Sequence, residues 1–151
     1  MELKQSVVLQ VIQKLEGELS VLSQAARTAH EAATHEESKP EDQYDTRGLE
    51  ASYLASAQAK RAEEIQAAVI YFKNAELRSL RLLTVEIMKR KQHYLIASLG
   101  GGISVQVGEQ AIQVLTPDSP LGGELAERQM GESFEVEIRE TSRTYRVLSA
   151  E

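Results

Sequence analysis

Acidic side chains gather in one short polar stretch, residues 36–45, which contains five acids and one lysine. Carboxylate oxygens are the ligands that Mg²⁺ prefers, and a bound Mg²⁺ can activate water for hydrolysis. The stretch is therefore either a solvated, charged turn or a set of carboxylates that a longer element carries to a partner's active site. In the second case we expect Glu37 and Glu41 to be the functional carboxylates, with Glu36 and Asp42 as substitutes.

Other metal or phosphate chemistry finds little support in the sequence. Cysteine is absent, which excludes disulfides and thiolate zinc sites, and the three histidines, His30, His35 and His93, are scattered. We therefore expect no preformed metal site. Gly100-Gly101-Gly102 could be a phosphate-binding loop, but it opens a strand and no Lys-Ser/Thr follows, so a turn is predicted.

The overall charge bears on the kind of partner. A formal net charge of -6 argues against broad binding to the nucleic-acid backbone and against stable binding to free DNA, so a protein partner is expected. No apolar run approaches the roughly 18 residues of a membrane span, and the N-terminus lacks a signal-peptide pattern. We expect a cytoplasmic protein.

Two long helices must position the acidic stretch. Apolar residues recur at alternating steps of four and three in the first 33 residues, and again, without proline, after the acidic stretch. This alternation is a heptad seam, which predicts helices that pack lengthwise. The first seam consists of Val8, Ile12, Leu15, Leu19, Leu22, Ala26, Ala29 and Ala33, and the second of Ala51, Ala55, Gln58, Ala62, Ile65, Val69 and Phe72.

The two seams share one antiparallel register. Every facing pair, from Ala33 with Ala51 to Ile12 with Phe72, has residue numbers that sum to 84, which centres the turn near Asp42. At about 1.5 Å per residue, a helix of about 30 residues is on the order of 45 Å long. Residues 1–77 are thus predicted to form an antiparallel coiled-coil hairpin with an acidic tip at about 34–45. An ordinary dimerisation coil is the alternative.

The period changes to two after Leu77, which predicts strands. Two hairpins are expected over residues 83–99 and 103–114, and two further strands around residues 134–138 and 145–147. Ser119-Pro120 has the capping hydroxyl and first-turn proline of a helix start, and Gly131 suits the end of that short helix. Residues 78–151 are predicted to form a small domain of about six strands and one helix, so the fold class is α+β.

Two stretches resemble the bacterial Gre transcription factors, GreA and GreB. The more specific one consists of the glycine triplet at 100–102, the run Val114-Leu115-Thr116-Pro117-Asp118-Ser119-Pro120-Leu121-Gly122 and the segment Met130-Gly131-Glu132-Ser133-Phe134-Glu135-Val136. It is similar to the family's C-terminal signature. The other, residues 41–51, lies where the family carries its acidic tip. With the helical pattern, the resemblance covers essentially the whole chain.

The resemblance implies a fold, a partner and a mode of action. The second domain would be FKBP-like and bind core RNA polymerase at the rim of its secondary channel, with Ser119, Pro120, Leu121 and Gly122 in the family's signature region. The coiled coil would enter the channel, where Lys60 and Arg61 either face RNA or are simply solvated. The tip acids would help the polymerase's active site, through a shared Mg²⁺, to cleave backtracked RNA at its 3′ end. The chain would be a monomeric accessory factor that binds no cofactor alone, not an enzyme.

The tip departs from the family pattern of Asp, two residues, then Glu-Asn. When Glu41-Asp42 is placed on the family's Glu-Asn, Ser38 occupies the aspartate position and Pro40 is inserted between. Proline fixes its own φ and biases Lys39 away from helix. Three functions therefore remain open: a cleavage-stimulating elongation factor, a secondary-channel regulator without cleavage, and a generic coiled-coil or FKBP-like interaction module.

Overall fold

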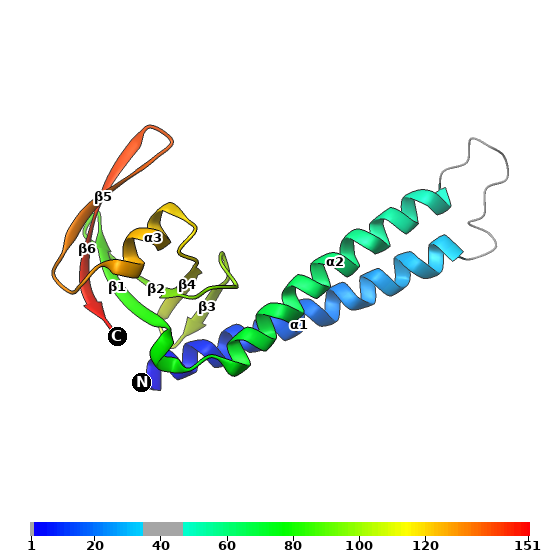
Figure 1. The fold of residues 1–151 in the computed structure, drawn as a ribbon, viewed down its shortest axis with the longest axis horizontal. Coiled ribbons are helices and arrows are strands. Elements are labelled where there is room, and N and C mark those ends of the chain that lie inside the picture. Colours follow the sequence, from blue (N-terminus) through cyan, green and yellow to red (C-terminus); the bar gives the residue numbers. More distant parts are fainter. Residues whose placement is uncertain (1, 35–46) are drawn as a thin grey trace. The chain divides into compact units, whose positions relative to one another are not determined.

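The computed structural model describes the backbone of residues 2–34 and 47–151, and the side chains of these residues apart from 26, 29, 30, 32–34 and 47–55. The predicted acidic tip at 34–45 lies almost entirely outside the described residues. The elements follow in the order α1 (Glu2–Thr34), α2 (Arg47–Asn74), a 3₁₀ turn (Leu77–Ser79), β1 (Arg81–Ile87), β2 (Arg90–Ile96), β3 (Ser104–Val107), β4 (Gln110–Leu115), α3 (Pro120–Glu127), β5 (Ser133–Ile138) and β6 (Thr141–Ala150) (Figure 1). The α+β class is confirmed.

The chain divides into two compact units. One unit consists of Met1–Ile12 together with Tyr71–Glu151, and the other of Gln13–Ile70. The first turns of α1 and the last residues of α2 therefore belong to the same unit as the sheet. The expected domain boundary after residue 77 stays a prediction.

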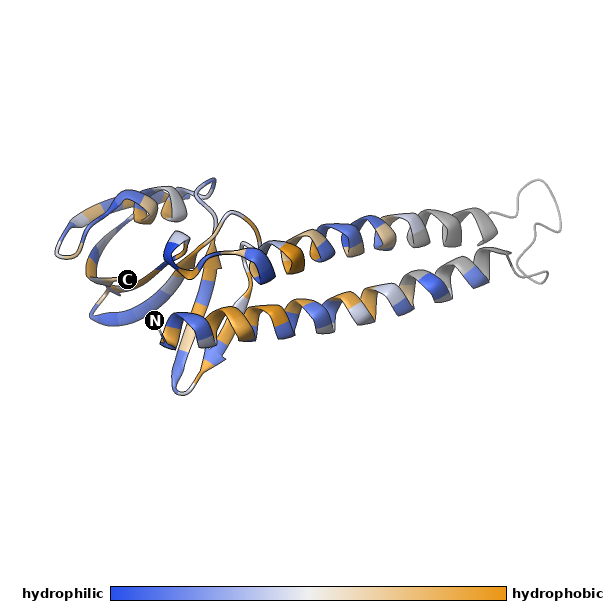
Figure 2. Cartoon of the chain, turned by 60° about the horizontal axis from the view of Figure 1, so that its bottom comes forward, coloured by the Kyte–Doolittle hydropathy of each residue, from blue (hydrophilic) through white to orange (hydrophobic). Residues whose placement is uncertain are grey.

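In the Gln13–Ile70 unit, α1 and α2 lie side by side and run in opposite directions (Figures 1 and 2). The predicted seam residues whose side chains are described are all buried or half-buried, whereas residues such as Val21 between them are exposed. Leu15, Ile65 and Val69 are the most buried of the seam in this unit. The seam therefore marks the covered face of each helix, while the residue-by-residue register stays a prediction.

The strands form one six-stranded mixed sheet with the order β3-β4-β2-β1-β6-β5. The pair β2–β4 is parallel, and the other neighbours are antiparallel. β1 lies between β2 and β6, so the first strand of the domain pairs with its last strand. Both predicted hairpins and both additional strands are confirmed, but β2 begins at Arg90, inside the polar stretch that was expected to connect the first two strands.

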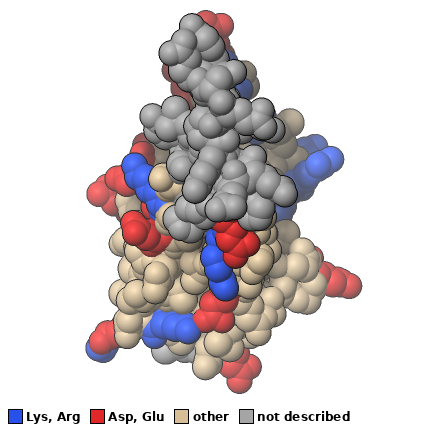
Figure 3. Space-filling model, turned by 90° about the vertical axis from the view of Figure 1, so that its right-hand side faces the viewer, with Lys and Arg blue, Asp and Glu red and all other residues tan. Residues whose placement is uncertain are grey.

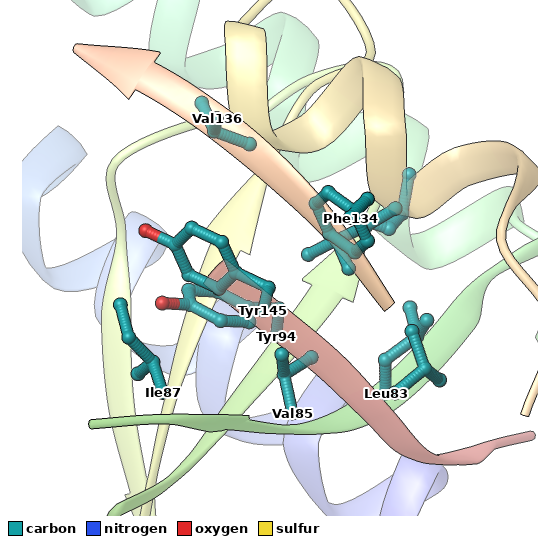
Figure 4. Close-up of a cluster of buried hydrophobic side chains, with 10 residues drawn as sticks. Leu83, Val85, Ile87, Tyr94, Phe134, Val136 and Tyr145 are labelled. Carbon is teal, nitrogen blue, oxygen red and sulfur yellow. The ribbon is translucent and has the colours of Figure 1, made fainter. Parts of the chain in front are cut away.

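The inner face of the sheet carries a cluster of buried apolar and aromatic residues, on which Leu121 and Leu125 of α3 pack (Figure 4). Alternation along each strand puts these residues on one face because side chains of a strand point alternately to opposite faces. Phe134 and Tyr145 stack with ring centroids 5.5 Å apart. The sheet residues of the cluster are Leu83, Val85, Ile87, Tyr94, Ile96, Phe134, Val136, Tyr145 and Val147.

Three contacts tie the ends of α1 and α2 to the unit that holds the sheet. Lys4 Nζ donates a hydrogen bond to the carbonyl oxygen of Leu77 at 3.2 Å, and the Ser98 N–H donates to the Tyr71 hydroxyl at 2.9 Å. The buried Phe72 ring lies against Gly100, where an added Cβ would be 2.8 Å from it. Gly100 has φ +84, so the glycine triplet forms a turn whose first residue needs both a left-handed backbone and the absence of a side chain.

Tight turns close the sheet hairpins. Met88-Lys89 joins β1 to β2 and Arg139-Glu140 joins β5 to β6, all four residues with φ between 50 and 67. Gly131 does not end α3 as predicted: the helix ends at Glu127, and Gly131 has φ +91 in the turn before β5. The end of α3 is set by partners far away in sequence, described below. None of the helices in residues 2–34 and 47–151 contains an apolar stretch long enough to cross a bilayer.

Candidate functional site

The four tip acids, Glu36, Glu37, Glu41 and Asp42, lie outside the described residues. Their role as carboxylates near a shared Mg²⁺ stays a prediction. Within residues 2–34 and 47–151, no three His, Asp or Glu side chains come together in a way that could hold a metal ion.

Lys60 and Arg61 lie on α2 and are exposed. The Arg61 Nη1 atom is 3.2 Å from Glu64 Oε2, and the two side chains are 60% and 55% exposed. A pair this exposed stabilises the helix by no more than about 0.5 kcal/mol, because water screens it. Because the pair is weak, water or an anion could replace Glu64 as the partner of the Arg61 guanidinium. This fits both the solvated and the RNA-facing alternatives.

An apolar groove runs along the helix pair beside Arg61. It has a volume of about 490 Å³ and is lined by Gly17, Val21, Leu22 and Ile65 among others. The groove is open at Gly17, since a Cβ added there would meet nothing within 4 Å. A glycine in a helix interior costs about 1 kcal/mol relative to alanine, so the groove is opened at the expense of helix stability.

The predicted signature residues form the start of α3, and the local hydrogen bonds explain the motif. Ser119 is the N-cap: its Oγ accepts from the Gly122 N–H at 3.0 Å and donates to the carbonyl oxygen of Thr116 at 2.8 Å. Pro120 occupies the first turn, where its missing N–H costs nothing. The motif thus holds the loop and the helix start in one fixed geometry.

Gly122 is required by packing. It is buried, and a Cβ at this position would lie 2.0 Å from the Thr116 carbonyl oxygen and 2.6 Å from Ser119 Oγ. Only glycine allows α3 to approach the preceding loop this closely. Pro120 and Asp118, in contrast, are exposed beside it. The signature residues thus form a close-packed, buried support next to two accessible side chains.

Arg81 ends the same helix, a role that no local pattern in the sequence predicts. Its Nη1 atom donates to the carbonyl oxygens of Leu125 and Ala126 at 2.8 and 2.6 Å, and its Nη2 atom donates to that of Arg128 at 2.6 Å. A guanidinium satisfies carbonyls that the helix leaves unpaired and interacts favourably with the negative end of its dipole. The partners are at least 44 residues apart, beyond any local pattern.

Arg128, the residue after α3, forms ion pairs with Glu124 in the helix and with Glu132 after it. Its Nη2 atom is 2.6 Å from Glu124 Oε2, and its Nη1 atom is 3.4 Å from Glu132 Oε2. The guanidinium carbon lies 5.0 Å from the centroid of the Phe134 ring. The hydrogen bond that Arg128 donates to Glu124 raises the pKa of Arg128; burial opposes this increase, and Glu132 adds a smaller one. Sequence reasoning missed this residue as well, although its spacing of four from both glutamates was a visible signal.

His93 and Tyr94 lie next to one another on β2 but on opposite faces of the sheet. His93 Nδ1 is hydrogen-bonded to Thr84 Oγ1 at 2.9 Å, and burial, helped by the nearby Lys91, lowers the pKa of His93 below its ordinary value. Tyr94 donates its hydroxyl to Gln92 Oε1. Burial raises the pKa of Tyr94, and Tyr145 adds to this, whereas Arg143 opposes it.

The described residues thus offer a rigid binding surface around α3. The described side chains around α3 do not bring a nucleophile next to a base. Their polar groups form hydrogen bonds with main-chain carbonyls or ion pairs with one another. In the face that Figure 3 shows, basic and acidic side chains are interspersed instead of forming a field of one sign.

Comparison with known proteins gives few matches. No protein-family model matches the sequence, and no match was found among curated proteins. The structural neighbours are Gfh1 proteins. Gfh1 of Thermus aquaticus is 16% identical, with 93% of this chain and 91% of that chain covered and a TM-score of 0.36.

A second neighbour, GreA factor homolog 1 (Gfh1) of Thermus thermophilus, is 18% identical, with 95% of this chain and 94% of that chain covered and again a TM-score of 0.36. The chain is therefore similar to these proteins over most of its length.

Proposed function

We propose that the protein is a bacterial transcription factor of the GreA/GreB type, which binds core RNA polymerase and inserts its helix pair into the secondary channel to modulate elongation. One observation carries the proposal: an antiparallel helix pair precedes a sheet domain in which Ser119 and Gly122 build the start of α3. The resemblance to the Gre signature falls on these same residues. The sheet domain would be the FKBP-like part and the helix pair a coiled coil.

The rigid start of α3 is the part that would hold the polymerase. Ser119 and Gly122 fix the loop from within, while Pro120 and Asp118 are accessible. A preorganised loop loses little conformational entropy on binding. The factor would act on the polymerase's own active site, with Mg²⁺ shared between the two, and would not be an enzyme by itself.

A pull-down with core RNA polymerase tests the proposal. The full-length protein is expected to bind and to be displaced by an excess of an active Gre factor, since both would use the same channel. A variant with Pro120→Ser and Asp118→Ser keeps the buried support and should bind less tightly. Thr141→Ser and Glu135→Ser, which change one neutral and one acidic exposed residue on the strands of the same unit, form a matched control. If the wild type is folded and does not bind polymerase, the protein is a generic interaction module.

A second candidate, a secondary-channel regulator without cleavage activity, is favoured by the tip sequence. Pro40 and the missing aspartate alter the spacing of the acids. Mg²⁺ requires oxygens at about 2.0–2.1 Å, and a misplacement of about 1 Å can reduce a rate about 100-fold. We therefore expect weak or absent stimulation of cleavage, with the channel still occupied.

Backtracked elongation complexes separate the two candidates. They would be incubated with wild type, with Glu37→Ala/Glu41→Ala/Asp42→Ala, and with Glu63→Ala/Glu109→Ala/Glu127→Ala, which removes the same number of exposed charges elsewhere. Negligible cleavage with all three, while each still displaces an active Gre factor, supports the regulator. Robust cleavage that only the tip variant loses would make the protein a working cleavage factor with an unusual tip.

A further inference from the structure

Acidic strand residues lie only on the outer face of the sheet, whereas the inner face carries arginines. The strands contain three glutamates, Glu86, Glu135 and Glu137, and each alternates with buried residues of the inner-face cluster. All three therefore point to the outer face. The inner face carries Arg81, which is used by α3, and two further arginines, Arg90 and Arg143, but no carboxylate from any strand.

Arg90 and Arg143 lie on the inner face beside the buried cluster. Arg90 pairs with Ile87, and Arg143 pairs with Val136, both of which belong to the buried cluster. Both arginines are exposed, and neither forms an ion pair within the part of the chain that the structure describes. Two strongly positive side chains thus stand at the edge of an apolar cluster without a partner of opposite charge.

A polar hollow lies on the neighbouring strands. It has a volume of about 430 Å³ and lies where β2 and β4 come together, and its lining includes Gln92, Gln113, Lys91 and Glu109 but neither arginine. The parallel pairing begins only at His93 with Ile112, although the two strands start at Arg90 and Gln110, so the first residues of each are not paired with the other. The hollow therefore offers the side-chain amides of Gln92 and Gln113 next to strand edges that are not paired with one another.

We propose that this open strip, defined as Arg90, Gln92, Gln113 and Arg143, binds an acidic, extended segment of a partner protein. Carboxylates of the segment would pair with the two arginines through charge-assisted hydrogen bonds. The amides of Gln92 and Gln113 would pair with the main chain of the segment. No strand carboxylate lies on this face, and the hollow is lined by one acidic and one basic side chain, Glu109 and Lys91, so the net charge along the strip is positive.

The composition of the strip favours a peptide over single-stranded RNA. RNA-binding sheet faces present exposed aromatic rings on which bases stack. Here the rings of Tyr94 and Tyr145 are only 5% and 3% exposed, and they lie together in the buried cluster with their hydroxyls pointing the same way (Figure 4). Two arginines and two glutamine amides can recognise a carboxylate-bearing strand without stacking.

Fluorescence anisotropy on the full-length protein tests the proposal without any polymerase, so its outcome is independent of the proposed function. The probe is a labelled peptide in which glutamate and serine alternate; a glutamine–serine peptide and a labelled oligouridine serve as comparisons. Arg90→Gln/Arg143→Gln removes the two inner-face charges. Arg139→Gln/Arg146→Gln is the matched control, since both residues are exposed arginines of the same unit and neither lines the hollow.

The acidic peptide is expected to bind wild type in a salt-dependent manner, and the inner-face variant is expected to lose about tenfold in affinity while the control changes by about twofold or less. Circular dichroism would establish that both variants are folded. Failure of the acidic peptide to bind, equal losses in the two variants, or tighter binding of oligouridine than of the peptide would each overturn the proposal.

Discussion

Gly122 lies so close to the carbonyl oxygen of Thr116 that a β-carbon on it would be 2.0 Å away. Gly122→Ala should therefore force α3 away from the preceding loop and destabilise the protein by about 3 kcal/mol or more. Gly17→Ala is the control, because its new methyl group meets nothing within 4 Å and alanine favours helix. It should stabilise the protein by about 0.5–1 kcal/mol. Urea unfolding would measure both; equal effects would mean that the close approach is relieved at little cost.

Arg81→Met should destabilise the protein by about 2 kcal/mol or more, because it removes a charged donor from three carbonyl groups at the end of α3 while keeping most of the side-chain volume. Arg78→Met removes an arginine three residues earlier whose ion pair with Glu76 is exposed, and should cost less than about 0.5 kcal/mol. The two variants would be compared by thermal and urea unfolding. Similar losses in both would contradict a specific role of Arg81 at the helix end.

Ser119→Ala removes the N-cap of α3 and should cost about 1 kcal/mol. Ser119→Thr retains a hydroxyl that can accept from the Gly122 N–H and should recover most of this loss. Amide hydrogen exchange would locate the effect, since the first turn of α3 should lose protection in the alanine variant while the centre of β1 keeps it. A uniform loss across the sheet would mean that Ser119 acts through global stability instead.

His93 should make stability depend on pH. Burial lowers the pKa of His93 in the folded state, so the unfolded chain binds more protons and stability rises with pH. The contribution is complete above the ordinary histidine pKa of about 6.5 and is lost as pH falls through the lower folded value. His93→Gln should reduce the fall in the urea midpoint between about pH 7.5 and pH 5.5. An unchanged pH dependence in the variant would assign the fall to other groups.

Much of the fold could be predicted because its signals are local. Heptad spacing marked the buried positions of α1 and α2, period-two alternation marked the strands, and the Ser119-Pro120 pair marked the start of α3. The end of α3 could not be predicted, because Arg81 supplies the partners of its last carbonyls from another element. Gly131 was a reasonable local candidate for that end, and it serves a turn instead.

The candidate site was predictable to a smaller degree. The signature residues came from a resemblance, and the structure adds the physical reason for Gly122, which no spacing rule could supply because the contact depends on the path of the preceding loop. The open strip was invisible in the sequence, since Arg90 and Arg143 are 53 positions apart in numbering and share a face only through the order of β2, β1 and β6. Pairing order, not composition, brings such residues together.

The position of β1 between β2 and β6 has a consequence for how the chain folds as it is made. The paired residues of β1 and β6 are 60 to 67 positions apart, so β1 cannot complete its pairing until β6 has been synthesised. Contacts of such long sequence separation form slowly, whereas the turns of α1 can form as soon as they are synthesised. Until β6 is present, the edge of β1 opposite β2 has no neighbour and the sheet is incomplete.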